Sequence, residues 1–242
     1  MSKRPIRIAV GIPTMHERAG WVCPHLFQWA TDLPYTVGDR YQFTITKLHN
    51  FIPAAAARNF FCRQMKDLEP RPDWLLMIDN DMAPPMNLLD CVQNAPEDAM
   101  VVVPQFQMWD ESKPAIKLCW GMDDSVAPLT QEGKFFTLEY GKFYPLTKCG
   151  TGAIFMRPEL FDKIDMPYFW YTINQDQGME ATEDINFSLK AIAAGCKIYG
   201  NSSISVGHYH NVNLDVLARF FVPRPQQEVP VSNLGIDKEV KA

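Results

Sequence analysis

Apolar residues along this chain fall into short runs between turn signals, and the clearest run covers residues 74–78. Its length is typical of a strand buried on both faces, and the two prolines at positions 84 and 85 disfavour a longer strand or a helix that follows at once. Asp79 and Asp81 come directly after the run. Both carboxylates are therefore expected at the carboxyl end of a central strand.

Strand-like and helix-like patterns alternate before this run. Residues 6–12 and 41–48 are expected to form strands, and residues 22–33 and 53–65 are expected to form helices with a proline near the start. Strand–helix–strand repeats imply parallel strands that are joined by right-handed crossovers. The pattern thus predicts the α/β class, with a mainly parallel central sheet flanked by helices.

The pattern in the second half of the chain is less regular. Turn signals between short aromatic segments over residues 107–146 predict a small antiparallel excursion from the sheet. Thr182 is a suitable N-cap for a helix that stops at Gly195, and Glu183 and Asp184 fill the first turn, where the helix dipole favours acidic side chains. Further short helices are expected at 86–94, 158–164 and 214–221, and further strands at 100–104, at 148–156 and from 197 onward.

The composition is that of a soluble globular protein, because the 242 residues are 47% hydrophobic and 21% charged. The net charge of −5 argues against an affinity for nucleic acid that rests on neutralising phosphates. The six cysteines have no paired C-x-x-C spacing and indicate reduced thiols rather than a zinc ribbon or a disulfide framework. No apolar run has the length of a signal peptide or a transmembrane helix, so we expect a cytoplasmic protein without membrane insertion.

One domain is the default for this length. We expect it to cover residues 1–222, in two halves at 1–106 and 107–222. Residues 223–242 are rich in proline and polar side chains and are expected to form an extended or flexible tail.

Two interpretations of Asp79 and Asp81 follow from the residues themselves. Carboxylates this close repel each other unless a cation shares them, and a hard divalent ion with free positions for phosphate oxygens would do so. Alternatively, the two side chains cap the local backbone of a turn, as aspartates often do. The strand pattern favours neither.

Other short motifs along the chain place this pair in a wider pattern. Glu17 follows residues 12–14 at the end of the first strand, Arg58 and Asn59 lie in the second helix, and Gly150-Thr151-Gly152 opens a buried strand. Glu183 and Asp184 open a helix, and His208 and His210 come late. In this order the motifs resemble those of a family 2 type glycosyltransferase of the GT-A fold, and they span nearly the whole chain.

The resemblance implies a single GT-A, Rossmann-like domain that moves a sugar from a nucleoside-diphosphate sugar to an acceptor hydroxyl with the help of Mn²⁺ or Mg²⁺. It implies that residues 1–106 form the nucleotide- and metal-binding half and residues 107–222 the acceptor-side half. A UDP-sugar is the favoured donor. The residues implied to bind the nucleotide sugar are Pro13, Thr14, Glu17, Arg58, Asn59, Asp79, Asn80, Gly150, Thr151 and Gly152. Those implied to bind the metal are Asp79, Asp81, His208 and His210.

Within that site the resemblance implies a division of roles. Asp81 is the direct metal ligand and Asp79 contacts the ribose or a metal-bound water. A nitrogen ligand from one of the two late histidines would favour Mn²⁺ over Mg²⁺. Asp184 is the implied base of an inverting transfer, with Glu183 as second choice, and Arg58 either holds the diphosphate or buttresses the loop of Asp79.

The sequence departs from the family at the end of the second strand, where residues 46–50 lack the usual paired aspartates that help bind the base. The acceptor is either a saccharide or glycoconjugate, or a hydroxymethylated base in viral DNA as in small bacteriophage enzymes, in which case the location is the host cytoplasm. The aromatic residues 168–171 suit either acceptor or simply pack in the core. The other classes considered are a nucleotidyltransferase that makes sugar nucleotides, which would need a glycine-rich phosphate loop that is missing here, and an inactive binding module.

Overall fold

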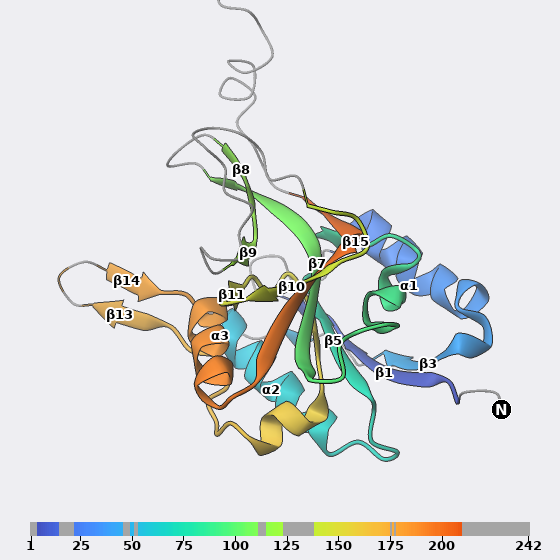
Figure 1. The fold of residues 1–242 in the computed structure, drawn as a ribbon, viewed down its shortest axis with the longest axis horizontal. Coiled ribbons are helices and arrows are strands. Elements are labelled where there is room, and N and C mark those ends of the chain that lie inside the picture. Colours follow the sequence, from blue (N-terminus) through green and yellow to red (C-terminus); the bar gives the residue numbers. More distant parts are fainter. Residues whose placement is uncertain are drawn as a thin grey trace, which may run out of the picture.

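The strand Trp74–Ile78 (β5) lies inside a large mixed sheet, as its apolar sequence predicts (Figure 1). The computed structural model describes residues 4–14, 22–45, 49–50, 53–110, 115–122, 138–174, 176 and 178–209. In spatial order the main path of the sheet is β10 (Phe143–Leu146), β15 (Lys197–His208), β7 (Ala99–Asp110), β12 (Ala153–Met156), β5, β1 (Ile6–Gly11) and β3 (Tyr41–Ile45).

Most strands of this path run in one direction. β1 pairs in parallel with β3 and β5, and β15 pairs in parallel with β7. β12 runs the other way between β5 and β7, and β10 runs the other way at the edge beside β15. The predicted fold class, α/β with a mainly parallel central sheet, is confirmed.

Helices cover both faces of the sheet. They are α1 (Pro24–Thr36), α2 (Ala54–Lys66) and α3 (Glu183–Ala193), with 3₁₀ helices η2 (Gly38–Arg40), η3 (Leu88–Val92) and η4 (Pro158–Asp162). The shorter strands are β2 (Pro13–Thr14), β4 (His49–Asn50), β6 (Met82–Ala83), β8 (Ala115–Leu118), β9 (Trp120–Gly121), β11 (Lys148–Cys149), β13 (Thr172–Asn174) and β14 (Gly178–Ala181). β13 and β14 form a hairpin that projects from the body beside α3 (Figure 1).

The side chains of β5 alternate between two hydrophobic clusters. Leu76 and Ile78 belong to the cluster that contains Trp29 of α1. Leu75 and Met77 belong to the cluster on the opposite face, which the apolar sides of α2 and α3 complete. Because all five residues of β5 are buried, the strand is held from both faces, and its carboxyl end is a rigid place for polar side chains.

The apolar stripe of α2 also positions a charged residue. Phe61, Cys62 and Met65 face the sheet, and Arg58 lies on the same stripe one turn earlier. The helix sequence therefore directs a guanidinium into the interior, toward the carboxyl ends of the strands.

Several element boundaries differ from the sequence predictions. β7 continues beyond residue 104 to Asp110 and pairs antiparallel with β8, which confirms the antiparallel excursion. The run 148–156 is divided into β11 and β12, because residues 150–152 leave the sheet before β12 pairs with β5. The helices expected at 86–94 and 158–164 are short 3₁₀ helices.

The helix expected at 214–221 and the tail at 223–242 lie outside the described residues. The two-half division of the domain stays a prediction. Among the described residues, no helix has both the length and the apolar composition needed to cross a membrane.

Candidate functional site

The turn after β5 is fixed by backbone hydrogen bonds from both sides. The N–H of Asp79 donates to the carbonyl of Gly152 at 2.8 Å, and the N–H of Met82 donates to the carbonyl of Asp79 at 3.1 Å. Asn80 is buried, and its carbonyl accepts the N–H of Cys23 at 2.7 Å. Because these bonds are made by the backbone, the side chains of Asp79 and Asp81 remain available for other contacts.

Asp79 meets a buried arginine. Both nitrogens of the Arg58 fork donate to the two carboxylate oxygens of Asp79, at 2.9 and 3.0 Å, and the Arg58 side chain is 5% exposed. Burial alone would lower the pKa of Arg58, but Asp79 outweighs this effect and the pKa is raised, so the guanidinium stays charged. Of the two roles considered for Arg58, this geometry corresponds to buttressing the Asp79 loop.

The same guanidinium reaches the start of α3. Nε of Arg58 lies 3.5 Å from Oε1 of Glu183, and one Nη also donates to the carbonyl of Thr151 at 3.4 Å. Arg58 therefore joins the two acidic motifs, which are about a hundred residues apart in sequence, through one side chain.

Glu183 and Asp184 differ in their surroundings. The side chain of Glu183 is 12% exposed and contacts Arg58. The pKa of Tyr171 is raised to about 12 by the burial of Tyr171 itself and by the nearby Glu183 carboxylate. Asp184 accepts hydrogen bonds at Oδ1 from the hydroxyl of Thr182 and from the N–H of Ile185, the latter at 2.8 Å. Thr182 is the N-cap residue of α3, as the sequence pattern predicted, but its hydroxyl donates to the Asp184 side chain and makes no capping bond to the backbone of the first turn.

Strand pairing brings His208 to Asp81. β15 pairs antiparallel with β6, with His208 opposite Met82, and the N–H of Tyr209 donates to the carbonyl of Asp81 at 2.9 Å. Nδ1 of His208 donates to the carbonyl of Gln107 at 3.0 Å, and Nε2 lies 3.7 Å from Oδ2 of Asp81. Hydrogen bonding to Asp81 raises the pKa of His208, and burial opposes that rise.

These positions fit a divalent cation in part. Asp81 offers a carboxylate oxygen and His208 a ring nitrogen, and the bond from Nδ1 to a carbonyl is the arrangement that orients a metal-binding histidine. Within the described ranges no three His, Cys, Asp or Glu side chains gather as a metal-binding group. His210 lies outside those ranges, so its assignment stays a prediction.

The glycines at 150 and 152 have a packing role. A Cβ at Gly150 would lie 2.9 Å from Phe106 and 3.1 Å from Cys119, and a Cβ at Gly152 would lie 3.1 Å from the sulfur of Met82. Thr151 between them is buried. The contacts of Gly150, Thr151 and Gly152 with a nucleotide sugar stay a prediction.

At the end of β1, the segment of Pro13 and Thr14 forms β2, which pairs in parallel with His49 and Asn50 of β4. Glu17 lies outside the described residues. For Asn59 the contact with a nucleotide sugar stays a prediction, and the structure shows another contact. Its side-chain amide bonds to the backbone of Tyr168 and Phe169.

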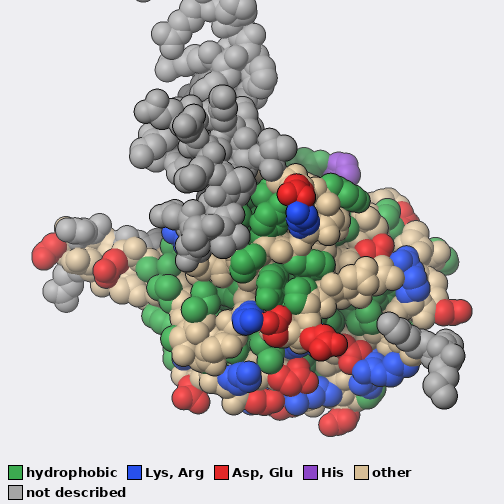
Figure 2. Space-filling view, viewed as in Figure 1, with side chains coloured by type: hydrophobic (Ala, Val, Ile, Leu, Met, Phe, Trp, Pro, Cys, Tyr) green, Lys and Arg blue, Asp and Glu red, His purple; other side chains and the backbone are tan. Residues whose placement is uncertain are grey.

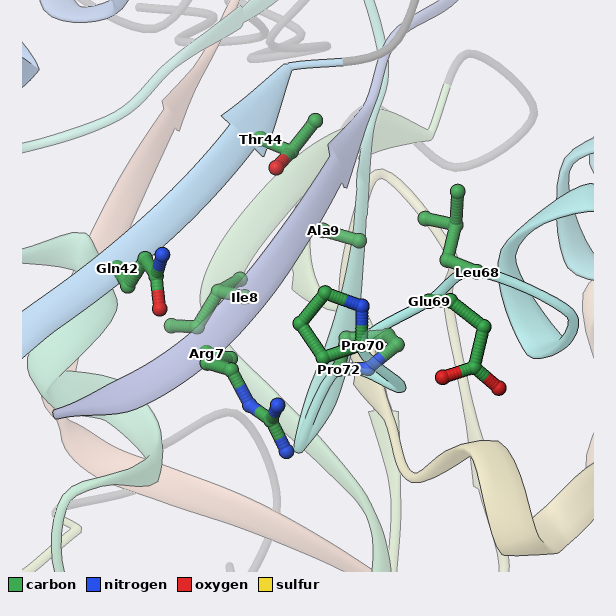
Figure 3. A pocket seen from close by; sticks show the side chains of 9 residues that line it. All are labelled: Arg7, Ile8, Ala9, Gln42, Thr44, Leu68, Glu69, Pro70 and Pro72. Carbon is green, nitrogen blue, oxygen red and sulfur yellow. The ribbon is translucent and has the colours of Figure 1, made fainter. Parts of the chain in front are cut away.

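A pocket of about 180 Å³ lies apart from the acidic motifs, over β1, β3 and the loop before β5 (Figure 3). Its lining residues are Arg7, Ile8, Ala9, Gln42, Thr44, Leu68, Glu69, Pro70 and Pro72. None of the residues predicted for the site contributes to it.

Comparison with known proteins establishes the fold. No family model matches the chain, and no curated protein matches it significantly. Among solved structures, A197 from STIV matches with a TM-score of 0.54 at 17% identity, over 85% of this chain and 87% of that chain. At 17% sequence identity this similarity shows a shared fold and nothing more.

Glycosyltransferases are among the other solved structures that this chain resembles. GalNAc-T7 with UDP, GalNAc and Mn²⁺ matches with a TM-score of 0.48 at 13% identity, over 88% of this chain and 45% of that chain. The catalytic domain of Drosophila β1,4-galactosyltransferase 7 with xylobiose matches with a TM-score of 0.45 at 14% identity, over 92% of this chain and 76% of that chain. The chain thus spans about half the length of the GalNAc-T7 structure.

Sequence reasoning missed two residues of this region. Tyr171 belongs to an aromatic run that the sequence could not divide into packing and site residues. Asn186 follows Glu183 by three positions, so the two share one face of α3, and this spacing was the available signal.

Proposed function

We propose that this protein is a metal-dependent glycosyltransferase that moves a sugar from a nucleoside-diphosphate sugar to an acceptor hydroxyl. One observation carries the proposal. Asp79 and Glu183, from two distant acidic motifs, share the buried Arg58 at the carboxyl end of a central strand, and Asp81 and His208 lie beside them. Open α/β sheets bind ligands at this edge.

The charges of this cluster favour a cation and a phosphate-bearing ligand. Asp79, Asp81, Glu183 and Asp184 supply carboxylates, against one guanidinium from Arg58. Asp81 and His208 are the residues that would hold Mn²⁺, with the remaining positions left for phosphate oxygens. When bound, the ion would neutralise the charge that develops on the leaving nucleoside diphosphate.

Asp184 is the residue to which we assign the base. Among the described residues Glu183 interacts with Arg58 and Tyr171, whereas both hydrogen bonds that the Asp184 side chain makes there are accepted at Oδ1. We therefore assign Oδ2 as the atom that accepts a proton from the acceptor hydroxyl. Arg58 connects the start of α3 to the loop after β5, so Asp184 lies in the same cluster as the proposed metal ligands, and we propose an inverting displacement. A positioned base of this kind contributes roughly 10²–10⁴-fold to the rate.

For the acceptor we propose a saccharide rather than a modified base in DNA. Tyr171 is partly exposed beside the acidic pair and offers an aromatic ring to a sugar. On the face drawn in Figure 2, the described Lys and Arg side chains are interspersed with Asp and Glu along the lower edge and form no continuous basic track. Binding to duplex DNA would call for such a track.

The test is a thermal-shift panel of UDP-, GDP-, dTDP-, CDP- and ADP-sugars, each with and without Mn²⁺. We expect one nucleotide class, with UDP favoured, to raise the melting temperature only when Mn²⁺ is present. A ligand at 100 times its Kd adds about 2.7 kcal/mol to the unfolding free energy. If no sugar nucleotide shifts the melting temperature with Mn²⁺, the proposal is wrong.

The product of the turnover reaction then separates the chemical classes. Incubation of the stabilising donor with saccharide acceptors, and separately with hydroxymethylated DNA, should release a nucleoside diphosphate with the saccharides. Release of pyrophosphate from a nucleoside triphosphate and a sugar phosphate would instead identify a nucleotidyltransferase. Transfer to the DNA alone would overturn the acceptor assignment.

A further inference from the structure

Residues 168–172, here called the aromatic segment, connect the end of η4 and its following turn to the β13–β14 hairpin. Residues 168–171 belong to no helix or strand, so they have no ladder partners for their backbone polar groups. Buried backbone groups still need hydrogen-bond partners. In this segment, two asparagine side chains supply them.

Asn59 of α2 holds the first half of the segment. Its Oδ1 accepts the N–H groups of Tyr168 and Phe169, at 2.7 and 3.0 Å, and its Nδ2 donates to the carbonyl of Phe169 at 2.7 Å. A planar amide thus bonds to three backbone groups of two consecutive residues. No other side-chain type offers a donor and an acceptor in this geometry except the longer glutamine.

Asn186 of α3 holds the second half. Its Nδ2 donates to the carbonyl of Trp170 at 2.8 Å and to the hydroxyl of Thr172 at 3.0 Å, and the asparagine is 7% exposed. Glu183 lies three residues earlier on the same face of α3. Each helix therefore provides one charged side chain to the acidic cluster and one amide to the aromatic segment, since Arg58 precedes Asn59 on α2.

The rings of the segment divide into two pairs. Tyr168 and Phe169 are buried and pack on Phe161 and Phe187, with ring centroids 4.8 and 4.4 Å apart. Trp170 and Tyr171 remain partly exposed, and Tyr171 interacts with Glu183. The inner pair anchors the segment in the core. Of the outer pair, Tyr171 lies beside Glu183, whereas the ring of Trp170 lies under Nζ of Lys190, 5.3 Å from the ring centroid.

We infer that Asn59 and Asn186 are positioning residues that hold the aromatic segment in place, with Tyr171 as a preformed wall beside Glu183 of the acidic cluster and Trp170 as its neighbour under Lys190. The wall is ordered before any ligand arrives. Its role as the acceptor side of the site rests on the proposed function, whereas its ordering by the two amides rests only on the hydrogen bonds of the aromatic segment.

The ordering is tested by ¹⁹F NMR of protein that carries 5-fluorotryptophan. The chain has six tryptophans, and the Trp170 signal is assigned by its loss in Trp170→Phe. In Asn59→Ala and in Asn186→Ala we expect the Trp170 signal to move toward the random-coil position and to sharpen. An unchanged Trp170 signal in both variants would overturn the inference.

Asn201→Ala is the matched control. Asn201 is also a buried amide that bonds to backbone, with Nδ2 donating to the carbonyl of Cys91 at 2.8 Å, but it contacts no part of the aromatic segment in the described structure. It should lower the melting temperature about as much as Asn59→Ala while the Trp170 signal stays in place. If Asn201→Ala moves the Trp170 signal as far as Asn59→Ala does, the shift reports a global loss of stability, and the inference fails.

A conservative variant keeps the test decisive if Asn59→Ala does not fold. Asn59→Asp keeps an oxygen for the N–H groups of Tyr168 and Phe169 and loses the donor to the Phe169 carbonyl. We expect a Trp170 signal between those of wild type and Asn59→Ala. A signal at the wild-type position would contradict the role of the donated bond.

A kinetic measurement extends the test to the proposed reaction. With a saccharide acceptor, Asn59→Ala should lower transfer by up to about 10²-fold, as misplacement by about 1 Å can. The loss should lie in the acceptor KM rather than in the donor KM, and a loss confined to the donor KM would overturn the acceptor-side assignment. If wild-type protein transfers no sugar, the proposed function fails, and the NMR result still decides whether the amides order the wall.

Discussion

The substitution Arg58→Met gives a direct test of the cluster at the end of β5. Methionine has a similar length and fits the apolar stripe of α2, so the change removes the charge and the fork of donors without opening a large cavity. It leaves Asp79 and Glu183 without their shared cation. Burial already raises the pKa of Asp79 and Arg58 opposes that rise, so the loss of Arg58 leaves a carboxylate that is costly to ionise.

The expected cost is large for one residue. Breaking a buried ion pair by removing one partner costs about 3–5 kcal/mol. Arg58 is 5% exposed, whereas the Asp79 side chain is 26% exposed and recovers some hydration, which favours the lower end of that range. A loss of about 3 kcal/mol lowers the melting temperature of a chain of this size by roughly 6–12 °C.

The assay is thermal and urea unfolding of Arg58→Met beside Arg71→Met. Arg71 pairs with Asp162 at 2.7 Å, but both side chains are well exposed, so this control should lose at most about 1 kcal/mol. Adding Asp79→Asn to Arg58→Met should recover much of the loss, because it removes the carboxylate left without a partner. Equal stability of Arg58→Met and Arg71→Met would refute the reasoning.

Three further predictions concern the site and the pH dependence of stability. Asp81→Ala should abolish the Mn²⁺-dependent rise in melting temperature with the donor, and an undiminished rise would show that Asp81 is not a ligand. Asp184→Asn should slow transfer by roughly 10²–10⁴-fold in initial-rate assays, and full activity would exclude it as the base. Burial raises the pKa of Asp73, but hydrogen bonds from Arg4 and from a backbone N–H of β1 lower it more, so the net pKa lies below its ordinary value. Asp73 therefore stabilises the fold at neutral pH, and this contribution disappears as the pH falls through the lowered pKa. The urea midpoints of Asp73→Asn and wild type should differ at pH 7 and converge in strong acid.

Sequence patterns predicted the elements that local chemistry controls. The apolar run of β5 is buried on both faces, the helix at Glu183 begins beside Thr182, and the strand–helix alternation of the first half produced parallel pairing. Each follows from periodicity, capping or turn chemistry within a few residues. Local patterns were less informative about strand direction and strand length, which pairing across the sheet decides. The direction of β12 and the length of β7 depend on partners that are distant in the chain.

At the candidate site, too, the sequence predicted some features and tertiary contacts decided the others. The sequence alone determined which residue types are present and in which order, and this was enough to single out the acidic motifs, Arg58 and the late pair of His208 and His210. Tertiary structure decided how they are used. The register of β15 against β6 places His208 at Asp81, and the buried stripe of α2 turns Arg58 toward Asp79 and Glu183. It also bonded Asn59 to the aromatic segment, which the sequence did not predict. The physical reason is that a side-chain amide bonds to the backbone groups that the packed helices bring within reach, and no local pattern encodes that distance.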